Sequence, residues 1–547
     1  MKSLHQFFTK PWLYLAIIIF GTFLKIYHFN YKLFWRDEIA TVLYTSGVKE
    51  SKYINDIPVN QIVSIKFVDS LLHNSRKPYS TKDEIKGILS DTHLTPAHYI
   101  LLAVWYRIVG DDNMDYRLLS IFLSILSLPF IFFLAKSLFK SGLGGWITTS
   151  LYAVSPFINC QSQEARYYIV WVFFFVLSNC LFLLATKHNR ILWWIAYAVA
   201  SVLALYSSIL SALFILGHLI YVLVCQKQLV TKLLVTHVCI LAAYAPWLYF
   251  LYTVRHTIQS GMSWHTFEHT SIFSLEFLFF QMLGWSKSFT YFSDWVFYFL
   301  LFTGKISQEL YVGLAVDIVI LCLIFYSIRH LIYKSSKEVK WYLISIILPL
   351  FLFFYISDII RNGLTSVVWR YQVVNMVGIT IVVANLFTHK IKDGKIWFMV
   401  LYCGLIISGL ISTIKIAEKR CWNTSPDCQS IINVAQVISQ ASYPLIITDL
   451  GGFGEYGFDN FLSTINESKS KNAEILYCKG AIPDIRKQVA GKAYSEIFVI
   501  QASDEFITTL KAQFGNNFFL YKKEDNAFYP QMIWKIKFEK ADFSLSR

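Results

Sequence analysis

Long apolar segments recur along this chain, and they constrain its fold more than any other feature. The first runs from Pro11 to Phe29, and comparable runs return at intervals up to Ile414. About 20 consecutive apolar residues suffice for a helix to cross a bilayer. Of the 547 residues 55% are hydrophobic and 15% are charged, against about 25% charged residues in a typical soluble domain. The sequence therefore predicts a mainly α, polytopic helical membrane protein with about eleven spans.

The net charge of +14 lies mostly in short Lys and Arg clusters between the apolar segments. Such clusters orient membrane helices, because cytoplasmic loops are enriched in these residues. No nucleic-acid partner is expected. Lys2 and Lys10 favour a cytoplasmic N-terminus, and Ala97–Val109 is too short for a span. If that segment does not cross, clusters such as Lys187 and Arg190 all face the cytoplasm, as expected for a multi-pass protein of the plasma membrane.

Two polar regions lie outside the apolar segments. The first exoplasmic loop covers residues 30–116, and within it Ile62–Leu72 has the spacing of a helix on the membrane surface. Residues 415–547 contain a helical segment, Ile431–Gln440, and then five strand-like runs. The runs are Pro444–Thr448, Glu474–Tyr477, Glu496–Gln501, Phe518–Tyr521 and Met532–Phe538.

These patterns predict a transmembrane catalytic domain over residues 1–414 and a small exoplasmic α/β domain over residues 415–547. We expect the second domain to have a structural or acceptor-handling role. Cys421 and Cys428 flank a polar loop at its start, and they are suited to form a disulfide if the loop lies outside the cytoplasm.

A polar octapeptide, Phe34-Trp35-Arg36-Asp37-Glu38-Ile39-Ala40-Thr41, directly follows the first apolar segment. Charge near a bilayer is costly, so it marks either a site of chemistry or an interfacial anchor. We interpret Asp37 as a general base that takes the proton from an acceptor hydroxyl, with Glu38 as its neighbour. The alternative is a solvated charge cluster at the headgroups, with Trp35 in an aromatic belt.

The same predicted face carries Glu164 with Arg166, the pair Arg370-Tyr371, and Arg117 at a helix mouth. Arginine forks match phosphate oxygens and keep their charge at the interface, which suits a lipid-phosphate donor. A polyprenyl phosphate is a good leaving group that electrostatic stabilisation alone can assist, so no metal cofactor is expected. We interpret four histidines as interfacial hydrogen-bonding residues rather than metal ligands. They are His93, His98, His265 and His269.

Each of these residues also has a structural interpretation. Arg117 and Arg370 are suited to extend from helix ends to the interface. Glu164 and Arg166 are suited to a loop ion pair, and Tyr371 to an aromatic belt.

Four stretches carry a family resemblance: "FWRDEIAT", "DTHLTPAHYILLAVWYRIVG" with "RLLS" opening the next span, "SPFINCQSQEARYYIV" and "SVVWRYQVVNMVG". In this order they resemble the glycosyltransferase-C superfamily, in the branch of protein O-mannosyltransferases and lipid A aminoarabinose transferases. The second reads Leu-Thr-Pro where the family has His-Pro-Pro, and the third offers Glu164 rather than an Asp-Pro pair.

The resemblance implies a glycosyltransferase-C fold and an inverting transfer of a sugar from a polyprenyl-phosphate donor to an exoplasmic acceptor. It implies that Asp37 is the base beside Glu38, and that Glu164 orders the second loop or touches the acceptor. It implies that Arg117, Arg166 and Arg370 contact the donor phosphate or brace the loops, and we assign Tyr371, beside Arg370, to the same donor-phosphate set.

Two other function classes stay open. A lipid-linked glycan polymerase or ligase shares the large exoplasmic loops but uses a long-chain donor. A non-enzymatic lipid or solute transporter predicts ionisable residues in mid-span and broken helices, whereas the charges here gather outside the spans. The expected partners are membrane lipids, the polyprenyl-phosphate sugar and an acceptor that is protein, lipid or glycan.

Overall fold

The computed structural model divides the chain into two compact units. It describes residues 2–46, 57–73, 80–90, 95–256, 275–291, 308–361, 363, 365–421, 428–449, 454–479, 483–489, 491–524 and 531–537. The first unit comprises Met1–Phe29, Thr92–Leu101 and Arg117–Glu418. The second comprises Asn30–Asp91, Leu102–Tyr116 and Lys419–Arg547, so residues 30–91 group with the C-terminal residues.

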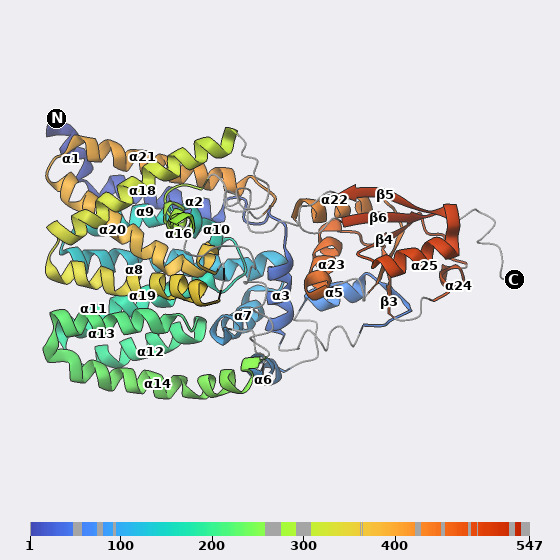
Figure 1. The fold of residues 1–547 in the computed structure, drawn as a ribbon, viewed down its shortest axis with the longest axis horizontal. Helices are drawn as coiled ribbons and strands as arrows, with labels where there is room; N and C mark the ends of the chain where they lie inside the picture. Colours follow the sequence, from blue (N-terminus) through green and yellow to red (C-terminus); the bar gives the residue numbers. More distant parts are fainter. Residues whose placement is uncertain are drawn as a thin grey trace. The chain divides into compact units, whose positions relative to one another are not determined.

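The first unit is a bundle of helices (Figure 1). They are α1 (Lys2–Phe8), α2 (Pro11–Ile26), α8 (Asn113–Phe139), α9 (Gly142–Ala153), α10 (Pro156–Ser162), α11 (Tyr168–His188), α12 (Ile191–Ser207), α13 (Ser211–Cys225), η2 (Lys227–Leu229), α14 (Val230–Thr253), α16 (Leu275–Ser286), α18 (Gln308–Lys334), α19 (Lys337–Arg361), η4 (Thr365–Val367), η5 (Trp369–Gln372), α20 (Val373–Lys392) and α21 (Ile396–Ala417). The first residues of α7 (Pro96–Val109) also belong to this unit, whereas the first residues of α8 belong to the second.

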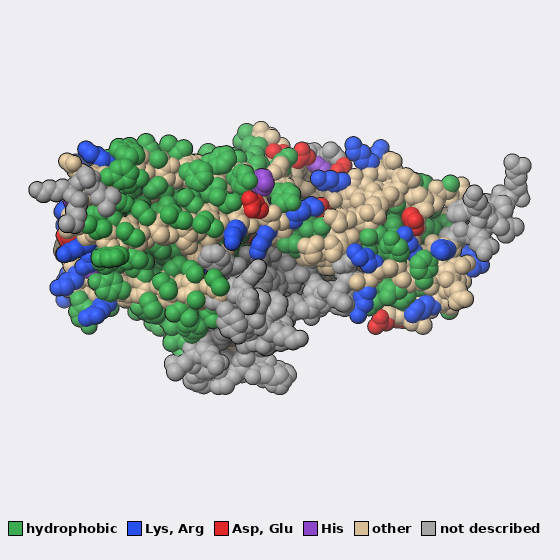
Figure 2. Space-filling view, turned by 90° about the horizontal axis from the view of Figure 1, so that it is seen from above, with side chains coloured by type: hydrophobic (Ala, Val, Ile, Leu, Met, Phe, Trp, Pro, Cys, Tyr) green, Lys and Arg blue, Asp and Glu red, His purple; other side chains and the backbone are tan. Residues whose placement is uncertain are grey.

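Seven helices among the described residues are long and apolar enough to cross a membrane, namely α8, α11, α14, α18, α19, α20 and α21. Three shorter apolar helices are also described, α2, α12 and α13, and α2 lies in the predicted first segment, Pro11–Phe29. Hydrophobic side chains cover most of the face of the bundle that Figure 2 shows. Large apolar residues are exposed on the bundle, such as Trp397 at 80%, which is expected where the solvent is lipid. The predicted fold class is confirmed, and the chain is an integral membrane protein.

One apolar run is interrupted. The pattern of Gly144–Asn159 by itself predicts a single spanning helix, but α9 ends at Ala153 and α10 begins at Pro156. A proline disfavours helical backbone in the residue before it, and Ser155 is accordingly extended, with φ −60° and ψ 117°. The break starts the short helix that leads to Glu164.

Helix α20 occupies the centre of the bundle. In its apolar window 94% of the residues are buried, against 28% for α14 at the periphery. Close packing elsewhere depends on small residues: a Cβ added to Gly217 of α13 would lie 1.9 Å from the carbonyl oxygen of Ser345 in α19. The bundle is therefore close-packed around α20, which follows directly after the Arg370-Tyr371 pair.

The basic clusters meet at one end of the bundle. A pocket of about 370 Å³ is lined by Lys140, Lys187, Glu338 and His389, from the ends of α8, α11 and α20 and the start of α19. Helices α11 and α20 begin at the opposite end, directly after the Glu164–Arg166 turn and the Arg370-Tyr371 pair. The two sets of charges therefore lie at opposite ends of these helices.

The second unit is built on a six-stranded sheet in the order β1-β3-β2-β4-β6-β5. The strands are β1 (Ile62–Ser64), β2 (Pro444–Asp449), β3 (Glu474–Cys478), β4 (Glu496–Ile500), β5 (Phe518–Glu524) and β6 (Gln531–Ile536). Strands β3, β2 and β4 are parallel, whereas β1, β6 and β5 join antiparallel. All five strands predicted after residue 415 are confirmed.

Helices lie on both faces of this sheet. The helices of the second unit are α3 (Arg36–Thr45), α5 (Lys66–Leu72), α6 (Thr81–Ser90), α22 (Cys428–Ser439), α23 (Gly454–Ser468), α24 (Ile485–Val489), α25 (Asp504–Phe514) and the short η7 (Gly515–Asn517), of which α3 packs against α23 and α5 rather than on the sheet. Leu445 and Ile447 pack with α24 and α25 on one face. Tyr477, whose side chain points to the other face, lies 5.5 Å from Phe461 of α23 between ring centroids.

The prediction of a surface helix over Ile62–Leu72 is wrong in its first part. Ile62–Ser64 form β1, which pairs with β3, and the helix α5 begins only at Lys66. A strand of three residues is too short for its apolar pattern to be separated from helical spacing. The predicted disulfide between Cys421 and Cys428 is present.

Candidate active site

Asp37 lies in the first turn of α3, in the second unit. The helix begins after Trp35, which is extended and 1% exposed. Carboxylates are favourable in a first turn because the backbone N–H groups there are positive. The Asp37 side chain is 19% exposed and lies 3.7 Å from Arg36 Nε, whereas Glu38 is fully buried. Asp37 is thus the accessible carboxylate of the pair.

Glu164, Arg166, Arg370 and Tyr371 come together in the first unit. Tyr168 interacts electrostatically with Glu164, Arg166 and Arg370, and the neighbouring Tyr167 interacts with both arginines and with Tyr371. The Arg166 guanidinium lies 5.8 Å from the Tyr167 ring centroid, and that of Arg370 lies 5.7 Å from the Tyr371 ring. We call these residues, with Tyr167 and Tyr168, the arginine–tyrosine cluster. It joins two arginines with hydroxyl groups and one carboxylate.

The turn that carries Glu164 and Arg166 is fixed to the end of α2. Gln163 Nε2 donates to the carbonyl oxygens of Leu24, Lys25 and Tyr27, at 3.2, 3.3 and 2.9 Å. Those carbonyls end a helix and have no partner within it. The side chain of Gln163 therefore satisfies the helix end and holds the turn in place.

A second set of contacts fixes the segment that carries Arg370. Buried Asp358 accepts hydrogen bonds from the backbone N–H groups of Thr365 and Ser366, at 2.9 and 2.6 Å. Trp369 packs so closely on α16 that a Cβ at Gly284 would lie 2.6 Å from its ring.

An ion pair lies against the same tryptophan. Lys287 Nζ lies 2.7 Å from Asp317 Oδ2 and 5.3 Å from the Trp369 ring centroid. Both charged side chains are at most 2% exposed. Sequence reasoning did not select this pair, although Asp317 stands within an apolar run, which is a signal for a functional or structural charge.

Arg117 has a described hydrogen bond elsewhere in the first unit. It is 2% exposed, and its Nη1 donates to the carbonyl oxygen of Phe29 at 2.8 Å. Phe29 is the last residue of the first unit before the chain enters the second. The structure thus gives Arg117 an anchoring contact, and its role at a donor phosphate stays a prediction.

His98 of α7, expected as an interfacial hydrogen-bonding residue, is instead enclosed by the protein. It is 1% exposed, and neither ring nitrogen has a hydrogen-bond partner among the described residues. Burial, with a smaller contribution from nearby Arg166, lowers the pKa of His98 to about 3. A neutral imidazole offers one donor and one acceptor beside the arginine–tyrosine cluster. His93, His265 and His269 lie outside the described residues.

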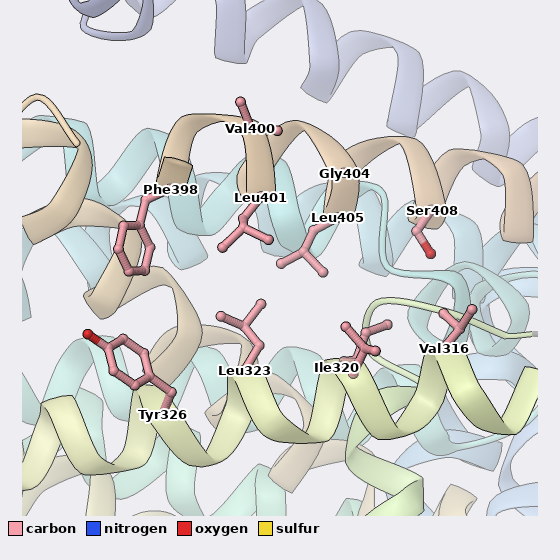
Figure 3. A pocket seen from close by; sticks show the side chains of 11 residues that line it. Val316, Ile320, Leu323, Tyr326, Phe398, Val400, Leu401, Gly404, Leu405 and Ser408 are labelled. Carbon is pink, nitrogen blue, oxygen red and sulfur yellow. The ribbon is translucent and has the colours of Figure 1, made fainter. Parts of the chain in front are cut away.

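An apolar groove of about 560 Å³ runs between α18 and α21 (Figure 3). Leu401 and Leu405 of α21 face Leu323 and Ile320 of α18 across it. Its lining residues are Val316, Val319, Ile320, Leu323, Tyr326, Phe398, Val400, Leu401, Gly404, Leu405 and Ser408. Tyr326 and Phe398 stack at one end, at 6.1 Å between ring centroids, and Val316 at the other end precedes Asp317. The groove has the chemistry to hold a hydrocarbon chain.

Residues 93–250 match the sequence model of a family described as dolichyl-phosphate-mannose-protein mannosyltransferase. The predicted resemblance to this mannosyltransferase family is confirmed. The matched stretch contains His98, Arg117, Glu164 and Arg166, whereas Asp37 and Arg370 lie outside it. Among the described residues, no group of three or more His, Cys, Asp or Glu is placed to hold a metal ion.

Among solved structures, the chain is similar to a crystal structure of ArnT from Cupriavidus metallidurans bound to undecaprenyl phosphate. The identity is 12% and the TM-score 0.43, over 80% of this chain and 87% of that chain. The curated proteins include no match to this sequence.

Proposed function

We propose that this chain is a membrane glycosyltransferase that moves a sugar from a polyprenyl-phosphate donor to an acceptor on the exoplasmic side. The arginine–tyrosine cluster carries the proposal, because it concentrates two guanidinium groups at one end of a helical membrane bundle. The match of residues 93–250 to a family of dolichyl-phosphate-dependent mannosyltransferases supports the same donor chemistry.

In this proposal the donor phosphate binds Arg166 and Arg370. Guanidinium groups make charge-assisted, bidentate hydrogen bonds to phosphate oxygens, and their attraction is strong where water is excluded. Asp37 takes the proton from the acceptor hydroxyl while that oxygen attacks the anomeric carbon. The bond between the anomeric carbon and the phosphate oxygen breaks, and its electron pair leaves on the polyprenyl phosphate, where the arginines stabilise the charge. Attack opposite to the leaving phosphate inverts the anomeric centre.

The proposal requires Asp37 to reach the acceptor hydroxyl beside the donor sugar. Glu38 is then the buried neighbour of the base, Glu164 orders the turn beside Arg166 or touches the acceptor, and Tyr371 adds a hydroxyl to the donor site.

The groove between α18 and α21 is our proposed site for the polyprenyl chain. Its lining is apolar and opens along two helices long enough to cross a membrane. Burying hydrocarbon there is favourable at about 25 cal/mol for each Å² removed from water. At its Val316 end the groove reaches Asp317, the next residue of α18. Asp317 pairs with Lys287, and Lys287 contacts the ring of Trp369, the residue before Arg370. A chain in the groove would thus end near the proposed phosphate site.

The side of the membrane follows from the two ends of the bundle. Lys140, Lys187 and His389 gather at one end, which we assign to the cytoplasm by the preference of Lys and Arg for cytoplasmic loops. The arginine–tyrosine cluster and the C-terminal domain are then exoplasmic, in the plasma membrane. The Cys421–Cys428 disulfide supports this side, because disulfides persist in oxidising compartments.

The deciding experiment is Asp37→Asn in proteoliposomes. The probe is a panel of polyprenyl-phosphate monosaccharides, and the measurement is the release of polyprenyl phosphate in the presence of membrane acceptor extracts. Loss of a general base lowers the rate by roughly 10²–10⁴-fold, so we expect near-complete loss at normal membrane levels. Asp69→Asn, at an exposed carboxylate on α5, is the matched control and keeps wild-type release.

Full activity in Asp37→Asn removes Asp37 as the base. A donor preference for long glycans rather than single sugars would favour the polymerase or ligase class. Transport of the intact lipid without release of phosphate would favour the transporter class.

A further inference from the structure

The chain enters α3 through a short segment, residues 31–34, which we call the entry strap. Its last carbonyl, Phe34 O, accepts a hydrogen bond from Ser463 Oγ of α23 at 2.7 Å. Ser463 is fully buried. Phe34 stands three residues before Asp37, so this bond fixes the backbone directly at the start of the helix that carries the proposed base.

Arg420 fixes the preceding residues of the strap. Its carbonyl oxygen accepts from the backbone N–H of Leu33 at 2.9 Å, and its guanidinium lies 5.7 Å from the Tyr31 ring centroid. The same guanidinium forms an ion pair with Glu467. Ser463 and Glu467 are four residues apart on α23, so they lie on one face of that helix. One face of α23 therefore holds the strap directly and through Arg420.

The C-terminal domain also holds the chain that follows α3. Strand β1 pairs with β3, and the backbone N–H groups of Asn60 and Ile65 donate to the carbonyls of Tyr477 and Ala473, at 2.7 and 3.0 Å. The helix α3 itself packs against α23. Its buried side chains include Ile39, Val42 and Leu43, each with no exposed surface.

We propose that the C-terminal α/β domain is the device that positions Asp37 for transfer, with Ser463 as the positioning residue nearest to it. The inference deepens the proposed function and rests on it for the role of Asp37. Reacting groups must be held in near-attack geometry, and a displacement of about 1 Å costs up to 10²-fold in rate. The C-terminal domain thereby contributes to the rate of a reaction whose proposed donor site is formed by Arg166 and Arg370.

The first test measures hydrogen exchange of the full chain in detergent micelles. In α3 the amides of Glu38 and Ile39 donate to the Trp35 carbonyl at 2.9 and 3.0 Å. We expect Ser463→Ala to increase their exchange rate at least tenfold. Ser468→Ala is the matched control, because Ser468 Oγ donates within α23, to Ile465 O at 2.7 Å. We expect Ser468→Ala to leave hydrogen exchange in α3 at the wild-type rate. If Ser463→Ala also exchanges at the wild-type rate, the inference is overturned.

The second test separates positioning from folding. With the panel donor that the wild-type chain uses, Ser463→Ala is expected to lower kcat by roughly ten- to hundredfold and to leave the donor KM within twofold. Ser463→Thr keeps the hydroxyl and restores kcat. An equal loss of kcat in Ser468→Ala, or a rise in KM at constant kcat, overturns positioning. If Asp37→Asn keeps full activity while Ser463→Ala still increases hydrogen exchange in α3, the proposed role of Asp37 is refuted. The finding that the C-terminal domain orders α3 then stands.

Discussion

At the scale of single residues, His98 shows how burial changes the chemistry of a common side chain. An exposed histidine gains a proton near pH 6.5, whereas burial and the neighbouring Arg166 hold the pKa of His98 at about 3. The ring is therefore neutral at physiological pH. Its nitrogens, which have no hydrogen-bond partner among the described residues, suit a neutral polar group of the proposed donor rather than a second charge.

This pKa makes stability depend on pH. Below pH 6.5 the unfolded chain binds a proton at His98 that the folded chain does not, so stability falls as the pH drops toward 3. The loss amounts to about 2 kcal/mol at pH 5. We expect His98→Gln to show a smaller decrease in Tm between pH 7 and pH 5 than the wild type, measured by thermal unfolding in detergent. His188→Gln, at an exposed position, keeps the wild-type decrease. If the Tm of His98→Gln decreases between pH 7 and pH 5 as much as that of the wild type, His98 is not the source of the pH dependence.

At the scale of helices, the Lys287–Asp317 pair joins α18 to the segment after α16, beside Trp369. Ser286 Oγ adds a hydrogen bond to Asp317 Oδ1 at 2.6 Å. Removing both charges of a buried pair is often neutral, but removing one leaves the other buried without compensation. The pair thus couples the groove helix α18 to the segment that holds Arg370.

Asp317→Asn is expected to lower the free energy of unfolding by about 3–5 kcal/mol, since Lys287 would stay buried and charged. The double variant Lys287→Met with Asp317→Leu removes both charges and recovers most of that loss. Thermal unfolding of the purified protein measures both. Asp393→Asn, at an exposed helix end, gives the baseline. A double variant as unstable as Asp317→Asn would show that the uncompensated charge of Lys287 is not the cause of the instability.

At the scale of the whole molecule, the two helices that follow the arginine–tyrosine cluster, α11 and α20, connect chemically different ends. Helix α11 starts after Arg166 and ends at Lys187 and His188, and α20 starts after Tyr371 and ends at Lys390 and Lys392. Membrane insertion responds to such asymmetry in Lys and Arg. The orientation is therefore a property of the whole chain rather than of one segment.

Cysteine labelling tests that orientation. In a chain that keeps Cys421 and Cys428 but has its seven free cysteines replaced, single cysteines are introduced at Lys187 and Lys487. We expect a membrane-impermeant maleimide to label Lys487→Cys in intact cells and Lys187→Cys only after lysis. The reverse pattern would place the arginine–tyrosine cluster on the cytoplasmic side.

Elements with strong local patterns were predictable from the sequence. The strands β2 to β6 alternate or are continuously apolar between turn signals, and the long helices follow from length and hydropathy alone. The break before Pro156 and the strand β1 were not predictable. The first is a local proline effect inside an apolar run. The second depends on a pairing between Ile62 and Leu476, which local sequence does not encode.

The candidate site was predictable in part for the same reason. Glu164, Arg166, Arg370 and Tyr371 were selected because charges beside apolar runs stand out, and the structure brings these four together. The burial of His98 and the Lys287–Asp317 pair were missed, because a single sequence does not reveal which polar side chains the fold encloses. The catalytic and donor roles of all these residues, Asp37 included, stay predictions.

Strand β1 leaves the ribosome long before its partner, since β3 follows some 400 positions later. A nascent chain whose membrane bundle is already inserted must therefore hold its first loop unpaired until translation is almost complete. Closing so long a loop adds little entropic cost to the finished fold, but it delays the ordering of α3. Truncated or prematurely released chains would lack β3 and α23, and with them the contacts that hold α3 and the proposed base Asp37.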